Sequence, residues 1–306
     1  MNKEGPFIVL ASGEIVGSGD EQAGRQMSTT PLEPPGSGIP SVPTESEGPV
    51  FQTAPPPELW RLRDLGFFIT FAVFALVVVP FLLMMVYAIL QPLAHWKMTA
   101  TAAATNPILM VLFQLLSYVM ILAFVYVLVT VHYCLPFWAA LKWRSPGLRQ
   151  GLRLFLGGIA MVLASLAVSH FLPDKSPFPL EQLFNSPAAA YTLAAFAIFA
   201  APFMEELIFR GVLFAFFERH GGLRFAVIST TLLFGALHVP EYWGAWTHAL
   251  IILGVGLICS LVRAITDSLA PSVILHAVFN GSGMVMLFFA TDHFRTVQAL
   301  ATLCAG

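Results

Sequence analysis

Charged residues are scarce in this sequence. Of 306 residues, 10% are charged and 57% are hydrophobic, and the mean hydropathy is +0.78. A soluble domain carries roughly 25% charged residues, so this composition excludes an ordinary soluble domain and predicts an integral membrane protein embedded in the lipid bilayer. The formal net charge of −2 and the lack of a basic run argue against nucleic acid as a partner.

Cysteine is also rare. Cys134, Cys259 and Cys304 lie far apart and form neither a C-x-x-C pair nor a regular spacing, which excludes a disulfide framework and leaves the redox compartment open. The apolar stretch "FIVLASGEIV" near the N-terminus is short and contains Glu14, so it is not expected to act as a signal peptide.

The chain changes composition after about residue 60. Residues 1–60 are rich in Pro, Ser, Gly and Glu, which cannot bury enough apolar surface to offset chain entropy, so we predict a disordered tail. The remainder is expected to contain two N-terminal transmembrane helices at 61–148, a transmembrane core at 149–292 and a short C-terminal tail at 293–306.

Long apolar segments follow one another from Leu65 onward, and most reach the roughly 20 residues that a bilayer-spanning helix needs. They cover 65–90, 107–138, 152–172, 188–217, 225–240, 247–263 and 270–290. The predicted fold class is therefore all-α, a polytopic transmembrane bundle of about seven or eight helices.

Lys and Arg set the predicted orientation, because cytoplasmic connections carry an excess of them. Nine fall on one side, and only Lys97, Lys175 and Arg295 fall on the other. The nine are Arg61, Arg63, Lys142, Arg144, Arg149, Arg153, Arg219, Arg224 and Arg263. We therefore expect the N-terminus to be cytosolic.

The stretch "APFMEELIFRGVLFAFF" (201–217) places three charges inside a hydrophobic segment. Each costs at least a few kcal/mol near the bilayer centre, so the three need partners or a function. Glu206 and Arg210 are four residues apart, share a helix face and can form an ion pair. Glu205 lies about 100° away without such a partner, which makes it the candidate general base or acid.

Two later segments add polar groups. "FGALH" (234–238) ends in His238, and "HAVFN" (276–280) puts His276 and Asn280 four residues apart on one face. At 1.5 Å per residue, Glu205 and His276 both fall toward the cytoplasmic side. His238 lies too far out unless the fourth and fifth helices overhang into the cytosol by about two turns. A water-filled, cytosol-facing chamber around the cluster would fit that geometry.

Three motifs in order carry a family resemblance: "EELIFR" (205–210), "FGALH" (234–238) and "HAVFN" (276–280). Over about residues 150–290 the chain resembles the CAAX prenyl endopeptidase and bacteriocin-processing family of intramembrane proteases, also called the abortive-infection family. That family's pattern is a Glu pair followed by x-x-x-Arg, then Phe-x-x-x-His, then His-x-x-x-Asn.

The resemblance implies an intramembrane endopeptidase in a bacterial plasma membrane, acting on a membrane-associated protein or peptide, prenylated or not. Glu205 and His238 would activate a water molecule, and His276 and Asn280 would stabilise the oxyanion. Glu206 and Arg210 would orient them. Zn²⁺ held by Glu205, His238 and His276 is one option, and a metal-free, glutamate-dependent route through the same residues is the other.

Other functions stay open at this stage. The chain contains no H-E-x-x-H, and "NGSG" (280–283) has Asn where the rhomboid motif needs Gly. A non-catalytic scaffold or immunity protein could keep the same residues, and a transporter could use them as a proton or ion path. Against the transporter, the sequence has no evident internal repeat.

Overall fold

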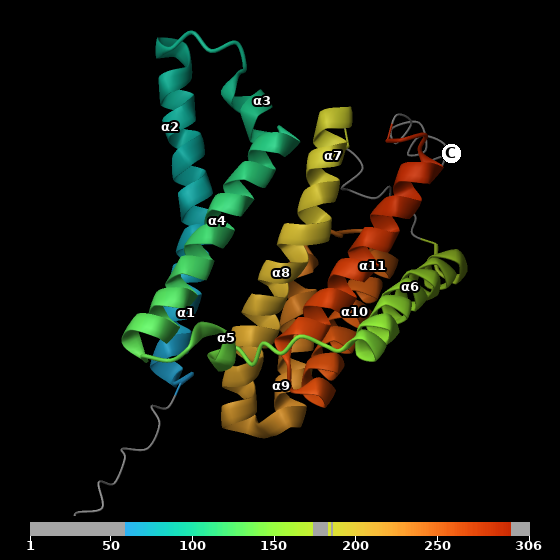
Figure 1. Ribbon diagram of the computed structural model, residues 1–306. Coiled ribbons are helices and arrows are strands. Elements are labelled where there is room, and N and C mark those ends of the chain that lie inside the picture. Colours follow the sequence, from blue (N-terminus) through green and yellow to red (C-terminus); the bar gives the residue numbers. More distant parts are fainter. Residues whose placement is uncertain (1–58, 174–182, 185, 295–306) are drawn as a thin grey trace, which may run out of the picture. The chain divides into compact units, whose positions relative to one another are not determined.

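The computed structural model describes residues 59–173, 183–184 and 186–294. The chain divides into two compact units, residues 1–54 and 55–306, and all described residues belong to the second. The predicted disordered tail therefore lies outside the described residues apart from its last two positions. Within the described part the regular structure is entirely helical and includes no strand, as predicted (Figure 1).

The N-terminal part forms a long helix pair joined by a short third helix. A π-helical turn interrupts the first helix, and another ends the second. The elements are α1 (Leu62–Val73), η1 (Phe74–Val78), α2 (Val79–Leu93), α3 (Ala100–Ala104), α4 (Pro107–Val127) and η2 (Leu128–His132). Asn106 caps α4 because its side-chain oxygen accepts hydrogen bonds from the N–H groups of Ile108 and Leu109 at 3.0 and 3.1 Å.

The C-terminal part forms a second group of helices, drawn from yellow-green to red in Figure 1. The elements are α5 (Phe137–Ala140), α6 (Leu148–Phe171), α7 (Pro187–Ala195), η4 (Phe196–Ala200), α8 (Ala201–Glu206), η5 (Leu207–Leu213), α9 (Phe214–His238), α10 (Trp246–Thr266) and α11 (Leu269–Ala290). Two π-helical segments, η4 and η5, flank α8 and interrupt its regular hydrogen bonding. Such segments widen the backbone and occur frequently at functional sites.

Six helical runs of the described residues are long and apolar enough to cross a membrane. The fourth, Pro187–His238, covers 52 residues, but its backbone turns at Gly222, where φ is 79° and ψ is 176°. Only glycine reaches this φ without steric cost, so the run is two arms rather than one rod. Two of the seven segments that hydropathy predicted, 188–217 and 225–240, therefore lie in this one run, one on each side of the turn.

The turn at Gly222 explains the depth of His238. Glu205 precedes Gly222 by 17 residues and His238 follows it by 16. Because the two arms extend by similar lengths from their common turn, the two residues lie at similar heights. This similarity in height is what the predicted overhang would produce, and the overhang into the cytosol itself stays a prediction.

Small residues bring the C-terminal helices together. A Cβ atom added to Gly235 would lie 2.7 Å from Leu253 of α10, and one added to Gly256 would lie 2.9 Å from Phe234 of α9. In the same way Gly158 of α6 packs against α11. In α11, by contrast, a Cβ at Gly281 would only make ordinary contact and one at Gly283 would meet nothing within 4 Å.

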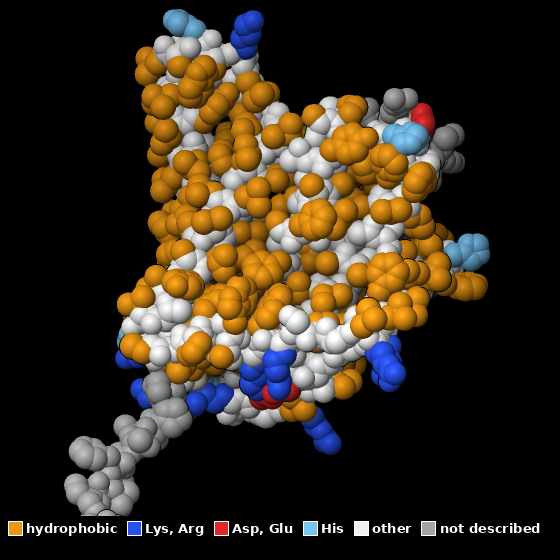
Figure 2. Space-filling model, viewed as in Figure 1, with side chains coloured by type: hydrophobic (Ala, Val, Ile, Leu, Met, Phe, Trp, Pro, Cys, Tyr) orange, Lys and Arg blue, Asp and Glu red, His pale blue; other side chains and the backbone are white. Residues whose placement is uncertain are grey.

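The surface is mostly apolar, and the cations visible in Figure 2 gather mainly at one end of the face shown. Large hydrophobic side chains such as Phe81, Phe199 and Phe289 are more than half exposed, as expected for groups in contact with lipid. At one helix connection Lys142 and Arg144 bind Asp267 at 2.7 and 2.9 Å. The cations therefore gather at one end as the Lys and Arg count predicted, and the cytosolic orientation of that end stays a prediction.

Candidate active site

The centre of the site is a buried ion pair. Arg210 Nη1 donates to Glu206 Oε1 at 3.0 Å, and both side chains are 0% exposed. Glu206 ends α8 and Arg210 lies one turn later in η5. The pairing predicted from their spacing is therefore present, and Glu206 is ionised because it faces a guanidinium.

Arg210 also ties its own helix to α10. Nη2 donates to the carbonyl oxygen of Gly256 at 2.5 Å, and Nε donates to Ser260 Oγ at 3.3 Å. The guanidinium carbon lies 4.7 Å from the centre of the Phe234 ring, which adds a cation–π contact. With all three nitrogens occupied, the guanidinium has one defined orientation and fixes the Glu206 carboxylate.

His276 lies between the two glutamates. Its Nδ1 is 2.9 Å from Glu206 Oε1, and its Nε2 is 3.8 Å from Glu205 Oε2. Since a carboxylate oxygen only accepts, the proton of the Nδ1 bond belongs to the imidazole. Nε2 is therefore directed toward Glu205. The Glu205 side chain is 20% exposed, whereas Glu206 is sealed, so Glu205 is the carboxylate that can meet a water molecule.

His238 ends α9, is half-buried, and has the same arrangement at its ring nitrogens. Nδ1 bonds the carbonyl oxygen of Phe234 at 2.7 Å, so Nδ1 carries the proton and Nε2 keeps its lone pair. The Phe234 ring lies 4.5 Å from the His238 ring and 6.0 Å from the His276 ring. This one aromatic side chain therefore contacts both imidazoles and the Arg210 guanidinium. Glu241, in the turn after α9, is exposed.

Asn280 comes one helical turn after His276 on α11 and reaches η4. Its Nδ2 donates to the carbonyl oxygen of Ala197 at 2.9 Å. The carboxamide nitrogen has two hydrogens, so this bond fixes the side chain and leaves one N–H for another acceptor. The sequence predicted that these two residues share a face, and the packing turns that face toward α8 and η4.

Arg263 was counted in the sequence as a cytosolic charge, but its side chain is 1% exposed. Nε donates to the carbonyl oxygen of Arg210 at 3.2 Å, and Nη1 binds Asp267 Oδ1 at 3.1 Å. Partial burial tends to raise the pKa of Asp267, but hydrogen bonds from Lys142 and Arg263 outweigh it and hold that pKa below its usual range. This network connects the backbone of Arg210 to the charged end of the molecule.

A buried group of potential metal ligands adjoins the ion pair. Ligand atoms of Glu206, Cys259 and His276 all lie within 4.8 Å of one another. Glu206 Oε2 accepts no hydrogen bond among the described residues. The zinc ligands expected from the resemblance were Glu205, His238 and His276. This expected set has only His276 in common with the buried group, and zinc binding by the expected set stays a prediction.

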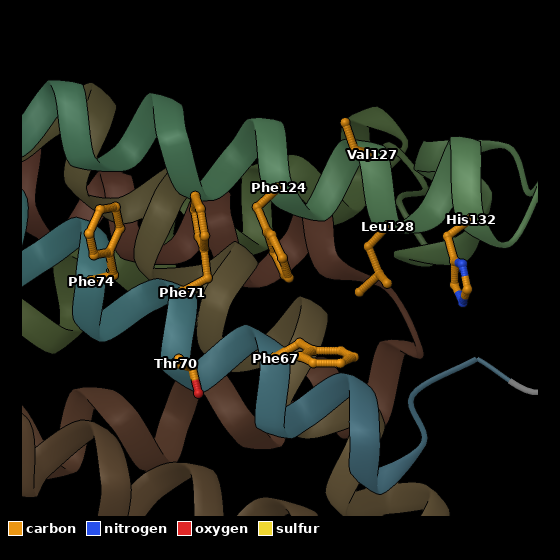
Figure 3. Close-up of a pocket in the computed structure, with 8 residues that line it drawn as sticks. All are labelled: Phe67, Thr70, Phe71, Phe74, Phe124, Val127, Leu128 and His132. Atoms are coloured by element: carbon orange, nitrogen blue, oxygen red, sulfur yellow. The ribbon is translucent and has the colours of Figure 1, made fainter.

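A separate apolar groove of about 470 Å³ lies between α1 with η1 and α4 with η2 (Figure 3). Its lining is almost wholly aromatic and aliphatic, with His132 at one end. The site residues come from α8, η5, α9 and α11, so this groove does not contain them.

The sequence analysis missed the contribution of α10. Gly256, Ser260 and Arg263 hold Arg210, and Cys259 faces the same carboxylate. One signal was available, because an arginine within a hydrophobic segment suggests a buried partner. No local pattern identified the other three residues.

A comparison with protein families supports the three motifs. The family described as "Type II CAAX prenyl endopeptidase Rce1-like" matches residues 187–282, a range that contains every predicted site residue. Neither the comparison with curated proteins nor the one with solved structures found a match. Residues 187–282 therefore match the model of the Rce1-like type II CAAX prenyl endopeptidase family, the family that the three motifs predicted.

Proposed function

We propose that this protein is a CAAX-type intramembrane endopeptidase that hydrolyses a peptide bond of a membrane-associated protein or peptide. The family is of the protease type, and the helices suit an integral membrane protein. One observation carries the proposal. His276 is anchored by Nδ1 on the buried Glu206, 2.9 Å away, and its Nε2 is directed toward the more exposed Glu205.

Glu205 is the proposed general base. It takes a proton from a water molecule that also bonds the free Nε2 of His238, and the oxygen attacks the scissile carbonyl carbon. The tetrahedral intermediate then collapses, and Glu205 returns the proton to the leaving nitrogen. The products are a carboxylate and an amine, and the enzyme is restored.

Asn280 and His276 are the proposed oxyanion donors. Asn280 has one N–H left after its bond to Ala197. Because its Nδ1 proton is used in the bond to Glu206, His276 can donate from Nε2 only as an imidazolium. Donors held in place before the reaction stabilise the developing charge more than mobile water does.

The alternative route uses Zn²⁺ held by Glu205, His238 and His276. Metal-binding histidines commonly donate their second N–H to a carbonyl or carboxylate, and both imidazoles do so here through Nδ1. The donor set therefore suits zinc, which would polarise the substrate carbonyl and acidify water when bound. In that case His276 is neutral, so its protonation state distinguishes the two routes.

We further propose that the N-terminus is cytosolic, that the protein resides in a bacterial plasma membrane, and that cleavage occurs close to the cytosolic surface. The gathering of Lys and Arg at one end supports the orientation. A prenylated C-terminal segment is the substrate class suggested by the family.

The test compares wild type with Glu205→Gln on farnesylated CAAX-type peptides and on unmodified membrane-proximal peptides. Loss of a general base costs about 10²–10⁴-fold in rate, so we expect Glu205→Gln to lose at least about 100-fold. The matched control is Glu218→Gln. This residue is a half-buried glutamate of α9 that binds Lys142 at 3.6 Å, outside the site, and the control should retain full activity.

Metal content is measured on the same purified samples. Stoichiometric zinc that is lost with activity on chelation would favour the zinc route, and activity in zinc-free protein would favour the metal-free route. Cleavage that survives Glu205→Gln would refute the proposal. A cellular role that survives the same substitution would instead support a scaffold, and proton-coupled flux in liposomes would support a transporter.

A further inference from the structure

The ligand group beside the ion pair includes groups that the proposed reaction does not use. Cys259 on α10 is 0% exposed, and its thiol faces Glu206 and His276 within 4.8 Å. Glu206 is also 0% exposed, and within the described part of the chain its Oε2 has no hydrogen-bond partner, whereas its Oε1 has two. An unpartnered carboxylate oxygen in a sealed site is costly unless a ligand can occupy it.

We propose that Cys259, Glu206 and His276 form an inhibitory binding site for a thiophilic divalent cation of the zinc class, next to the proposed catalytic site and sharing His276 with it. Thiolate, imidazole and carboxylate together are a ligand set that zinc and cadmium accept, whereas magnesium and calcium prefer oxygen. The inhibition rests on the proposed proteolytic function. The binding itself does not depend on it.

The charges of the site can accommodate such an ion. The thiolate of Cys259 and the carboxylate of Glu206 supply two negative charges against the two positive charges of the cation. Arg210 can keep its bond to Oε1 while the cation takes Oε2. The thiol proton leaves to solvent, so binding one cation releases one proton.

Occupation would disable His276. Its Nδ1 proton now bonds Glu206, so a cation at Nδ1 displaces that proton to Nε2. Nε2 then carries the proton and has no lone pair for zinc, so the zinc route is blocked. In the metal-free route the Nε2 N–H remains, and inhibition comes from the loss of its orientation. The Nδ1–Glu206 bond that orients the ring is lost at the same time. Because the ligands are sealed from solvent, we expect inhibition to develop slowly after the cation is added.

The experiment follows Co²⁺ by absorption, because a thiolate bound to Co²⁺ gives an intense charge-transfer band that carboxylate and imidazole ligands lack. The chain has three cysteines. The parent protein is therefore the full chain with Cys134→Ala and Cys304→Ala, so that Cys259 is its only thiol. Adding Cys259→Ala gives the comparison, and Cys259→Ser tests whether a weaker oxygen ligand restores binding in part.

We expect a charge-transfer band with the parent protein at one Co²⁺ per chain, and competition by Zn²⁺ or Cd²⁺. The band should vanish in Cys259→Ala, with affinity at this site weakened by at least about tenfold. After preincubation with Zn²⁺ or Cd²⁺, the parent should lose peptide cleavage. Cys259→Ala should retain it, because Cys259 takes no part in the proposed reaction.

A parent protein without the band, or a band that persists in Cys259→Ala, would overturn the proposed site. A band without inhibition would overturn its inhibitory role. If no peptide is cleaved even without added metal, the proposed protease function fails, while the absorption result still decides whether the cation site exists.

Discussion

Removal of the Arg210 side-chain charge gives the sharpest test of the buried ion pair. In Arg210→Met the unbranched apolar side chain keeps much of the volume, but Glu206 loses its guanidinium partner inside a sealed site. Breaking a buried pair by removing one partner costs about 3–5 kcal/mol, because an uncompensated charge is left behind. The carbonyl of Gly256 is not orphaned, since it still accepts from Ser260 Oγ at 2.8 Å. The cost therefore comes mainly from Glu206.

A double-mutant cycle isolates that cost. In Arg210→Met with Glu206→Gln the ion pair is removed as a whole, so we expect the double variant to lose less stability than the two single variants combined, by about 0.5–3 kcal/mol. Stability is measured as the free energy of unfolding in mixed detergent micelles. Arg210→Lys serves as the control, because lysine keeps the positive charge but lacks the planar guanidinium group. Its free energy of unfolding should lie between those of wild type and Arg210→Met.

The result that would refute this reasoning is additivity. If the double variant loses as much stability as the two single variants combined, Glu206 and Arg210 do not stabilise one another. The position of the Glu206 carboxylate, and with it the orientation of His276, would then need another cause.

Three further predictions concern packing and charge. Gly256→Ala puts a Cβ atom 2.9 Å from a phenylalanine ring of α9, so we expect a loss of about 1–3 kcal/mol in unfolding free energy. The control Gly254→Ala, whose Cβ meets nothing within 4 Å, should lose no stability. Equal stability of the two variants would contradict the packing argument. Because the pKa of Asp267 is lowered, its contribution to stability is present at neutral pH and is lost as the pH falls through that pKa. In Asp267→Asn the free energy of unfolding should therefore change less with pH on the acid side. The same pH dependence as in wild type would contradict this. Tyr133→Phe removes the hydroxyl that donates to the buried Asp64 at 2.5 Å. The free energy of unfolding, measured by thermal unfolding, should fall by about 1–3 kcal/mol. A loss under about 0.5 kcal/mol would contradict a strong hydrogen bond between these two side chains.

Much of the fold could be predicted from the sequence, because transmembrane helices are specified locally. A bilayer requires long apolar segments whose backbone groups are satisfied within the segment, so hydropathy alone located the spanning helices. The position of the chain reversal between Glu205 and His238 could not be predicted from hydropathy. Hydropathy separated the two arms, but only the backbone angles at Gly222 fix where the chain turns.

The pairs within one helix were equally predictable. Glu206 with Arg210, and His276 with Asn280, follow from the four-residue spacing that puts side chains on one face. The order of the three motifs was enough to predict the family that matches residues 187–282. The roles of Glu205, His238 and the other site residues stay predictions until the substitutions above are made.

The sequence by itself thus determined the helical class, the charged cluster within an apolar segment and the family whose model matches residues 187–282. Only the tertiary structure decided which nitrogen of each imidazole is anchored, and that α10 supplies the partners of Arg210. The physical reason is the distance along the chain. Arg210 and Gly256 are separated by 46 residues, and Glu206 and His276 by 70, so no helical period relates them. Their contacts are a property of the packed bundle rather than of any one segment, and in that bundle glycines bring α9 close to α10 and α6 close to α11.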